Sequence, residues 1–241
     1  MAYLHYISDD DIISLVESVI LIGFERKSGV EKDFNKNVID PFATIFDAAI
    51  SGFNHATWKE SEMVRQCQKT LTNHIGNLHQ KILGKVDGWE DLGTGTEVDL
   101  ISHPHRVIAE IKNKHNTLTG GRLSDEYHSL HDKISKKAST YFGYTAYFIN
   151  IVPKKTERFD VPFTPSDRST GAKVAINNNI RTMDGASFYH LVTGREFALK
   201  EFYTVLPDII EYVVVNNLGV KTFKIQDKAA FGNYYRLAYG E

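Results

Sequence analysis

Cysteine is almost absent from the sequence, and acidic and basic side chains nearly balance. The single cysteine, Cys67, cannot form an intramolecular disulfide, so a reducing, cytoplasmic compartment is expected. The formal net charge of -2 gives no support for nucleic-acid binding by the chain as a whole. No apolar run approaches the length of a membrane span, and no signal peptide is expected at the amino terminus. These absences argue against a disulfide-rich secreted scaffold and against a membrane partner.

Proline is also scarce, with six residues, and no linker argues for a division of the chain. With 241 residues and a 42% hydrophobic composition, the chain is long enough to bury one sizeable core. We therefore expect a single globular domain that spans residues 1–241.

Charge is unevenly distributed along the chain. Residues 112–158 contain nine Lys or Arg against four Asp or Glu, whereas residues 1–60 contain five against ten. A basic middle part can attract a polyanion to a local site, while the rest of the protein does not bind polyanions non-specifically. A solvated surface on which charges cluster by chance is the alternative.

Two packing helices are predicted near the amino terminus. Ser8 followed by three aspartates marks a helix start, and apolar residues continue at helical spacing to about Phe24. Asp40-Pro41 opens a second helix, which stops at Gly52. The longest helical pattern then runs over 58–83, and its apolar stripe includes the single cysteine as a structural thiol.

Two strand-like runs follow, and a turn separates them. Residues 98–101 and 107–111 are rich in Val, Leu and Ile, and His103-Pro104-His105 lies between them. This pattern predicts a β-hairpin. A metal-binding pair of histidines is the alternative to a polar turn, and the polar turn is the favoured interpretation.

Three charged side chains interrupt the two runs in a regular pattern. Side chains alternate between the faces of a strand, so Asp99 is expected on the face opposite Val98 and Leu100. By the same rule, Glu110 and Lys112 share one face. Two converging carboxylates suit Mg²⁺, and the implied chemistry is metal-assisted phosphodiester hydrolysis. The alternative is an ordinary strand pair whose charged face is solvated.

The same residues carry a family resemblance. Asp99 and the run Glu110-Ile111-Lys112 resemble the signature of the PD-(D/E)XK nuclease superfamily, with valine in place of its proline. The longer run AEIKNKHNT, residues 109–117, is similar to the catalytic strand of type II restriction endonucleases that cut GGWCC or GGNCC sites. Weaker similarity extends over most of the chain, at Arg65-Gln66, Gly76, His79-Gln80, Asp184-Gly185 and Thr193-Gly194.

The resemblance implies an α/β fold in which a mixed central sheet is flanked by helices. It implies Asp99, Glu110 and Lys112 as catalytic residues and Mg²⁺ as the cofactor, held by Asp99, Glu110 and the Ile111 carbonyl. Lys112 would orient or deprotonate the attacking water and offset charge in the transition state. Double-stranded DNA is the expected partner. A homodimer is expected because a two-fold symmetric site needs one active site per strand.

The resemblance also implies an internal organisation and a further acid. The chain is interpreted as a helical part to about residue 84, a catalytic core over about 85–155 and a DNA-recognition insertion over about 156–190. Similar nucleases send a glutamate from the long helix to the metal. Glu60 lies on the apolar stripe and Glu62 on the polar face, so Glu60 has the stronger reason to seek a metal. Either residue could instead serve only as a first-turn acid.

Residues after the catalytic strand are candidates for DNA contact. Asn113, Lys114 and Asn116 leave the sheet beside Glu110 and Lys112, and the same residue types also suit a plain strand exit. A glycine pair at 120–121 predicts a flexible loop. In the irregular region that follows Pro153, further candidate contacts are Arg168, Lys173, Asn177 and Arg181.

The remaining elements complete an α/β sandwich. A charged helix is predicted over 122–138 and a central strand, covered on both faces, over 144–152. A short strand is predicted over 187–192 and a helix over 195–206 that ends at Pro207. Residues 209–215 and 220–225 have strand or short helical patterns.

The leading functional hypothesis is a Mg²⁺-dependent type II restriction endonuclease that cuts at a GGNCC or GGWCC palindrome. A repair or junction-resolving nuclease on the same core would recognise DNA shape instead of sequence. A DNA-binding module without activity is the non-enzyme alternative, although the intact Asp, Glu and Lys argue against it.

Overall fold

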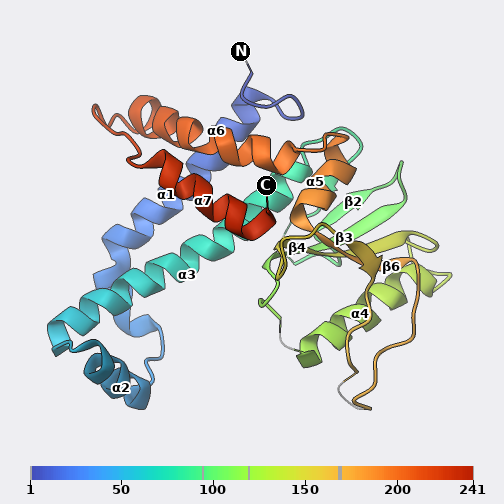
Figure 1. Cartoon of the computed structure of the whole chain (residues 1–241), viewed down its shortest axis with the longest axis horizontal. Helices are drawn as coiled ribbons and strands as arrows, with labels where there is room; N and C mark the ends of the chain where they lie inside the picture. The colour runs from blue at the N-terminus through green and yellow to red at the C-terminus, as the bar shows by residue number, and fades with distance from the viewer. Residues whose placement is uncertain (1, 94, 119, 168–169, 241) are drawn as a thin grey trace.

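The computed structural model describes residues 2–93, 95–118, 120–167 and 170–240. Its centre is a six-stranded mixed sheet in the order β1-β2-β3-β4-β6-β5 (Figure 1). The predicted α/β class with a mixed sheet flanked by helices is confirmed. The strands are β1 (Glu90–Asp91), β2 (Leu100–Ser102), β3 (Val107–Lys114), β4 (Thr145–Val152), β5 (Asp160–Pro162) and β6 (Ile180–Asp184).

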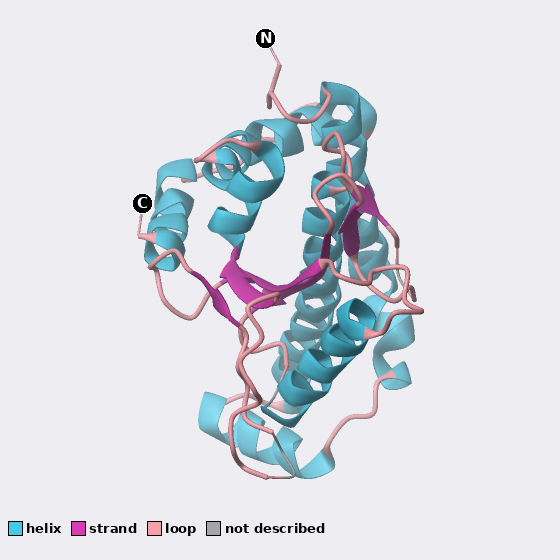
Figure 2. Ribbon diagram, turned by 90° about the vertical axis from the view of Figure 1, so that its right-hand side faces the viewer, coloured by secondary structure: helices cyan, strands magenta, loops and turns pink. Residues whose placement is uncertain are grey.

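Helices lie on both faces of this sheet (Figure 2). Among the described residues, no helix is long and apolar enough to cross a membrane. The α-helices are α1 (Asp9–Asp33), α2 (Pro41–Ser51), α3 (His55–Leu83), α4 (Gly120–Ser135), α5 (Gly185–Thr193), α6 (Ala198–Tyr212) and α7 (Lys228–Tyr239). The 3-10 helix η1 (Phe34–Lys36) follows α1, and the π-helix η2 (Val213–Asn217) follows α6.

The centre of the sheet is parallel and buried. Strands β3, β4 and β6 run parallel, and the strands outside them pair antiparallel. Ile149 and Ile151 of β4 enter the core formed with α1, α3, α5 and α6, whereas Ala146 and Phe148 enter the core formed with α4. The prediction of a central strand covered on both faces is confirmed.

The amino-terminal helices form an arm. Helices α1 and α3 pack side by side and extend away from the sheet, and α2 lies at the far end of α3 (Figure 1). Helix α1 continues to Asp33, past the predicted end at Phe24. The predicted second helix is confirmed, with Asp40 at its N-cap and Gly52 in the left-handed conformation at its C-cap. The interpretation of α2 as a packing helix is wrong, because none of its residues is buried.

Helix α4 begins earlier than predicted. The glycine pair expected to form a flexible loop forms its first turn, and the helix ends at Ser135. Tyr127, Leu130 and Ile134 of α4 pack beneath the sheet. Burial of this stripe stabilises the helix and fixes its position relative to β3 and β4.

The segment predicted as a strand over 187–192 is helix α5 instead, and the strand lies just before it as β6. The carboxylate of Asp184 caps the helix by accepting from the Ser187 N–H at 2.9 Å. At Gly185 a Cβ would lie 2.4 Å from the carbonyl oxygen of Ile151, so only glycine lets the helix start so close to β4. Capping and close packing therefore override the strand-like composition.

The predicted helix end at Pro207 is also wrong. Helix α6 continues through Pro207 to Tyr212 and passes into η2. Phe202 before the proline and Ile209 after it are both buried in the same core. This burial outweighs the hydrogen bond that proline removes. Residues 209–215 are therefore helical, and 220–225 form neither helix nor strand.

Candidate active site

The predicted hairpin is present and positions Asp99 against the middle of β3. Strand β2 pairs antiparallel with β3, in the register Leu100 to Ala109. The Asp99 N–H donates to the Ala109 carbonyl at 3.1 Å, and the Asp99 Oδ2 accepts from the Ile111 N–H at 2.7 Å. Both contacts hold the carboxylate beside the centre of the catalytic motif.

One detail of the predicted alternation is wrong. Leu100 enters the core beside α1 and α3, whereas Val98 enters the core beside α4. The two side chains therefore do not share a face, because Asp99 forms a bend before β2 begins and interrupts the period of two.

Glu110 and Lys112 share one face of β3, as predicted. Their side chains form a hydrogen-bonded ion pair. Both are largely shielded from solvent, since 16% of the Glu110 side chain and 21% of the Lys112 side chain are exposed. The neighbouring residue on that face, Ile108, is fully buried against α4. The pair therefore lies at the border between the core and the surface.

Burial and neighbouring charges shift the pKa values of Asp99 and Lys112. Burial, and then the negative charge of Glu110, raises the pKa of Asp99 to about 6, although the Ile111 N–H and Lys112 oppose this shift. Burial alone would lower the pKa of Lys112, but Glu110, Asp99 and Glu126 raise it by more. Lys112 therefore keeps its proton at neutral pH.

A cleft of about 420 Å³ opens beside these groups, between α3 and the end of β3. Asp99 and Lys112 line it, together with three of the predicted DNA contacts, Asn113, Lys114 and Asn116. The opposite wall is polar and comes from the carboxyl-terminal half of α3, through Thr72, Asn73, Gly76, Asn77 and Gln80.

Helix α3 is tied to the catalytic segment by direct contacts. The buried Gln80 amide donates to the Asp91 carboxylate at 2.7 Å and to the Asp99 carbonyl at 2.9 Å. At Gly76 a Cβ would lie 3.4 Å from the Asn113 Cβ, so the helix packs closely on the end of β3. The Asn113 amide also donates to the Thr72 carbonyl at 3.3 Å. These contacts fix the width of the cleft.

Comparison with known proteins gives this arrangement a family. The family model described as Eco47II restriction endonuclease matches residues 4–215. The chain belongs to the Eco47II restriction endonuclease family. The type II restriction enzyme Eco47II of Escherichia coli is 49% identical over 241 residues, which is 100% of both chains. The type II restriction enzyme Sau96I of Staphylococcus aureus is 34% identical over 209 residues, covering 85% of this chain and 78% of that protein.

Membership of the Eco47II family confirms the resemblance inferred from the EIKNKHNT run. The chain is a type II restriction endonuclease, that is, a site-specific deoxyribonuclease. The repair-nuclease and non-catalytic alternatives are not favoured. The geometry agrees with this result, since Asp99 and Lys112 line one cleft and Glu110 pairs with Lys112 beside it.

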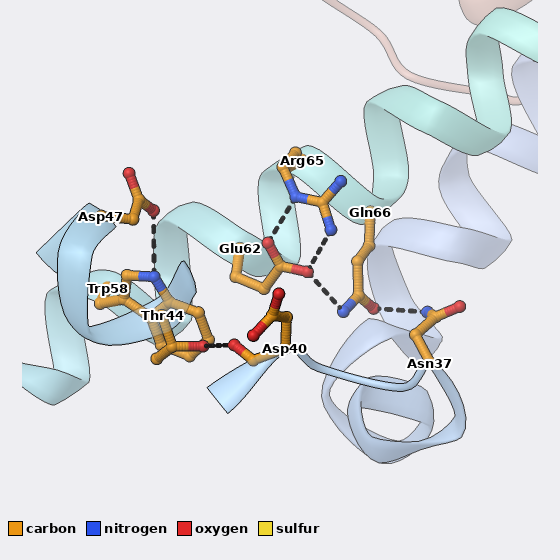
Figure 3. Close-up of polar contacts among 8 residues, drawn as sticks. All are labelled: Asn37, Asp40, Thr44, Asp47, Trp58, Glu62, Arg65 and Gln66. Atoms are coloured by element: carbon orange, nitrogen blue, oxygen red, sulfur yellow. Dashed lines mark hydrogen bonds and ion pairs between the residues drawn. The ribbon is translucent and has the colours of Figure 1, made fainter. Parts of the chain in front are cut away.

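The structure brings neither glutamate of the long helix to the site. The Glu62 carboxylate accepts from the Arg65 guanidinium at 2.6 Å and from the Gln66 amide at 3.0 Å (Figure 3). Glu60 is exposed. The preference for Glu60 is wrong because the amino-terminal half of α3 lies in the arm, away from the sheet, where its apolar stripe is not buried. The α3 side chain that reaches the catalytic segment is Gln80.

Sequence analysis missed a third carboxylate near the ion pair. Glu126 of α4 is half-buried, and burial together with the charge of Glu110 raises its pKa, while Lys112 and Lys133 lower it. Its position beside the buried stripe of α4 was visible in the helical spacing. Nothing in the sequence showed that α4 packs under the catalytic strand at this point.

The carboxylates of Asp99 and Glu110 suit a hard divalent cation such as Mg²⁺. Among the described residues, no three His, Cys, Asp or Glu side chains are close enough to hold an ion together. Asp99 and Glu110 supply two carboxylates, and Mg²⁺ commonly takes only one or two, with water and phosphate oxygens completing its shell. Burial and then the charge of Glu110 raise the pKa of Asp99, and a bound cation would offset both effects on this carboxylate.

The other predicted contacts that the structure describes lie outside the cleft. Arg181 forms an ion pair with Asp160 at 2.6 Å and donates to its main-chain carbonyl at 2.8 Å. Lys173 is exposed and Asn177 half-buried in the segment between β5 and β6, and Arg168 lies outside the described residues. Part of the predicted insertion, residues 180–190, belongs to β6 and α5.

The turn between β2 and β3 is polar, as predicted. His103 Nδ1 lies 2.9 Å from the Tyr144 hydroxyl, and His105 stacks on Trp89 with ring centroids 5.9 Å apart. The two histidines therefore have separate partners.

The raised pKa of Asp99 predicts an effect on stability in the absence of metal. An unfolded aspartate titrates near pH 3.9, so between about pH 4 and 6 the folded state keeps a proton that the unfolded state releases. The free energy of unfolding therefore falls as pH rises through this window. At pH 8, Asp99→Asn should stabilise the metal-free protein by about 1–3 kcal/mol in thermal or urea unfolding.

His79 changes the free energy of unfolding with pH in the opposite direction. The effect of Asp99 must therefore be measured as the difference in stability between wild type and Asp99→Asn. Burial lowers the pKa of His79 to about 4, so its contribution is present above pH 6.5 and is lost as pH falls. Asp87→Asn is the matched control, because Asp87 is exposed. The gain for Asp99→Asn should vanish at pH 4, and equal stability of wild type and variant at pH 8 would contradict the prediction.

Proposed function

We propose that the chain hydrolyses double-stranded DNA at a short palindromic site with Mg²⁺ as cofactor, through Asp99, Glu110 and Lys112. The observation that carries the proposal is a cleft lined by Asp99 and Lys112, with Glu110 paired to Lys112, that is also lined by Asn113, Lys114 and Asn116. Family membership supports the reaction class, and the geometry supports the choice of residues.

Each group has a distinct role in this proposal. Asp99, Glu110 and the Ile111 carbonyl would hold Mg²⁺, which when bound polarises the phosphate and makes water a better nucleophile. Lys112 keeps its proton beside the carboxylates. Its ammonium group therefore orients the water and stabilises the charge that develops on the phosphate oxygens, rather than removing a proton.

The polar face of α3 offers a path for the DNA backbone. A second hollow on this face is lined by Arg65 and Lys69 and shares Asn73 with the catalytic cleft. Lysine and arginine neutralise phosphates, so we propose that the duplex follows this face to Asp99. The segment over 163–179 is the proposed recognition element. Arg181 would position it through Asp160 and reaches DNA only by releasing that carboxylate.

The proposal includes two copies of the chain, acting in the cytoplasm. A palindromic site presents the same bases to each strand, so a two-fold pair of subunits gives each strand its own active site. The single cysteine and the restriction-enzyme family support an intracellular setting.

We predict that the recognised sequence is of the GGNCC type, with A or T as a possible restriction at the centre, and that cleavage after the first G leaves a 5′ overhang. Outer G·C pairs offer O6 and N7 acceptors to a basic side chain. Lys114→Ala should therefore cost roughly 1–3 kcal/mol and relax discrimination at one base pair if Lys114 reads a base.

Sequencing of fragment ends after digestion of a mixed-sequence library measures both points. For wild type, joining the sequences on the two sides of each cut should give GG and CC flanking a central base. If Lys114 contacts only phosphate, its variant should cut the same sites more weakly. Ends without flanking GG and CC would refute the predicted recognition sequence. They would not bear on the metal site.

A further inference from the structure

Helix α2 exposes a row of large apolar side chains at the end of the arm. Phe42, Ile45, Phe46 and Ile50 recur at helical spacing and are 70–85% exposed. No described segment of the chain covers this row, which we call the α2 surface. Contiguous apolar patches of this kind on soluble proteins mark sites of interaction.

Helix α2 is nevertheless tied to α3 through a buried tryptophan (Figure 3). The Asp40 carboxylate caps it by accepting from the Phe42 N–H at 2.9 Å. The Asp47 carboxylate accepts from the indole N–H of Trp58 at 3.1 Å, and Trp58 is buried. Helix α2 is therefore attached to the arm through Trp58, and its apolar side chains face outward.

Charge argues against DNA as the occupant of the α2 surface. The helix contains no Lys or Arg, and its single charged residue, Asp47, is engaged with Trp58. Binding to a phosphate backbone requires basic side chains, which on the arm lie instead along α3, at Arg65 and Lys69. The occupant is therefore an apolar protein surface.

The size of the surface suits a symmetric pair. Aromatic side chains bury about 150–250 Å² each, so four large side chains that are 70–85% exposed present roughly 400–800 Å². A standard interface takes about 800 Å² from each partner, and a two-fold contact uses the same patch on both copies. The α2 surface therefore supplies roughly half or more of that area.

We propose that the α2 surface is where two copies of this chain associate, with the α2 helices packed against each other across a two-fold axis. The inference rests on the proposed function, because cleavage of both strands needs two copies. At about 1.5 Å per residue, α3 holds Gln80 roughly 35–40 Å from the α2 surface. Two arms that meet at their α2 ends in a V, rather than in a line, would place the two active sites on either side of one duplex.

The test is a single charge at the centre of the surface. Phe46→Glu places two like charges face to face across the axis, whereas α2 has no buried residue whose loss would unfold it. Leu237→Glu is the matched control, because Leu237 on α7 is 74% exposed. Sedimentation equilibrium distinguishes a dimer from a 27.3 kDa monomer, and melting temperature checks folding.

Wild type and Leu237→Glu should be dimers at micromolar concentration, and Phe46→Glu should dissociate at least 100-fold more readily with an unchanged melting temperature. Mixing Phe46→Glu with Phe46→Lys should restore the dimer. Phe46→Glu should cut plasmid DNA at the wild-type sites at least 10-fold more slowly and accumulate nicked circles.

Each other outcome separates the two proposals. A Phe46→Glu protein that stays dimeric and cuts like wild type would overturn the α2 surface and leave the nuclease function intact. If wild type is a dimer but cuts no DNA, and Phe46→Glu is a monomer, the α2 surface is supported as the dimer interface and the proposed nuclease function is overturned. Loss of DNA binding with an intact dimer would assign the surface to DNA and refute the proposal.

Discussion

Lys112→Ala should lower the rate of DNA cleavage by about 10³-fold or more while DNA affinity changes less than about threefold. The ammonium group lies beside Glu110 and keeps its proton, so it acts on charge that appears only in the transition state. Removing a group of this kind affects turnover far more than ground-state binding. Single-turnover cleavage and binding measured in Ca²⁺ separate the two quantities.

The control for this variant is Lys133→Ala. Lys133 is a lysine of α4 that donates to the Ser129 hydroxyl and lies outside the catalytic cleft. It should retain cleavage within a few-fold of wild type. Unchanged cleavage by Lys112→Ala would remove Lys112 from the mechanism, and a comparable loss in Lys133→Ala would indicate a general effect of charge on binding.

Removal of divalent metal should abolish cleavage entirely. EDTA should stop the reaction, Mg²⁺ or Mn²⁺ should restore it, and Ca²⁺ should support DNA binding with little turnover because its looser coordination positions water poorly. The carboxylates of Asp99 and Glu110 are the side chains that would hold the metal. Hydrolysis at an undiminished rate in EDTA would refute the metal site.

A second readout makes the metal prediction independent of activity. Mg²⁺ should raise the melting temperature of wild type, since an ion between Asp99 and Glu110 offsets their repulsion. Asp99→Asn should lose most of this response. An equal response from both proteins would place the bound metal elsewhere.

The catalytic strand could be predicted from the sequence because its signals are local. Alternation and a proline-containing turn define the hairpin, and the same alternation puts Glu110 and Lys112 on one face. The strand over 145–152 was equally clear, since a continuous apolar run suits burial on both sides.

Features that depend on distant packing could not be predicted. Gln80 and Glu126 reach the catalytic region only because α3 and α4 dock against β3 and its neighbours. The choice between Glu60 and Glu62 failed because the helical wheel cannot show that this end of α3 stands away from the core. Helix α5 was mistaken for a strand because its cap and the close approach of Gly185 to Ile151 involve main-chain geometry.

The most direct test of the account compares wild type with Glu110→Gln on the same mixed-sequence DNA in Mg²⁺. Wild type should yield discrete fragments whose ends all derive from one short symmetric sequence. Glu110→Gln, with an unchanged melting temperature, should yield no fragments. Cleavage by Glu110→Gln at the same sites and rate, or random nicking by wild type, would contradict the assignment of Asp99, Glu110 and Lys112 as the site of a sequence-specific nuclease.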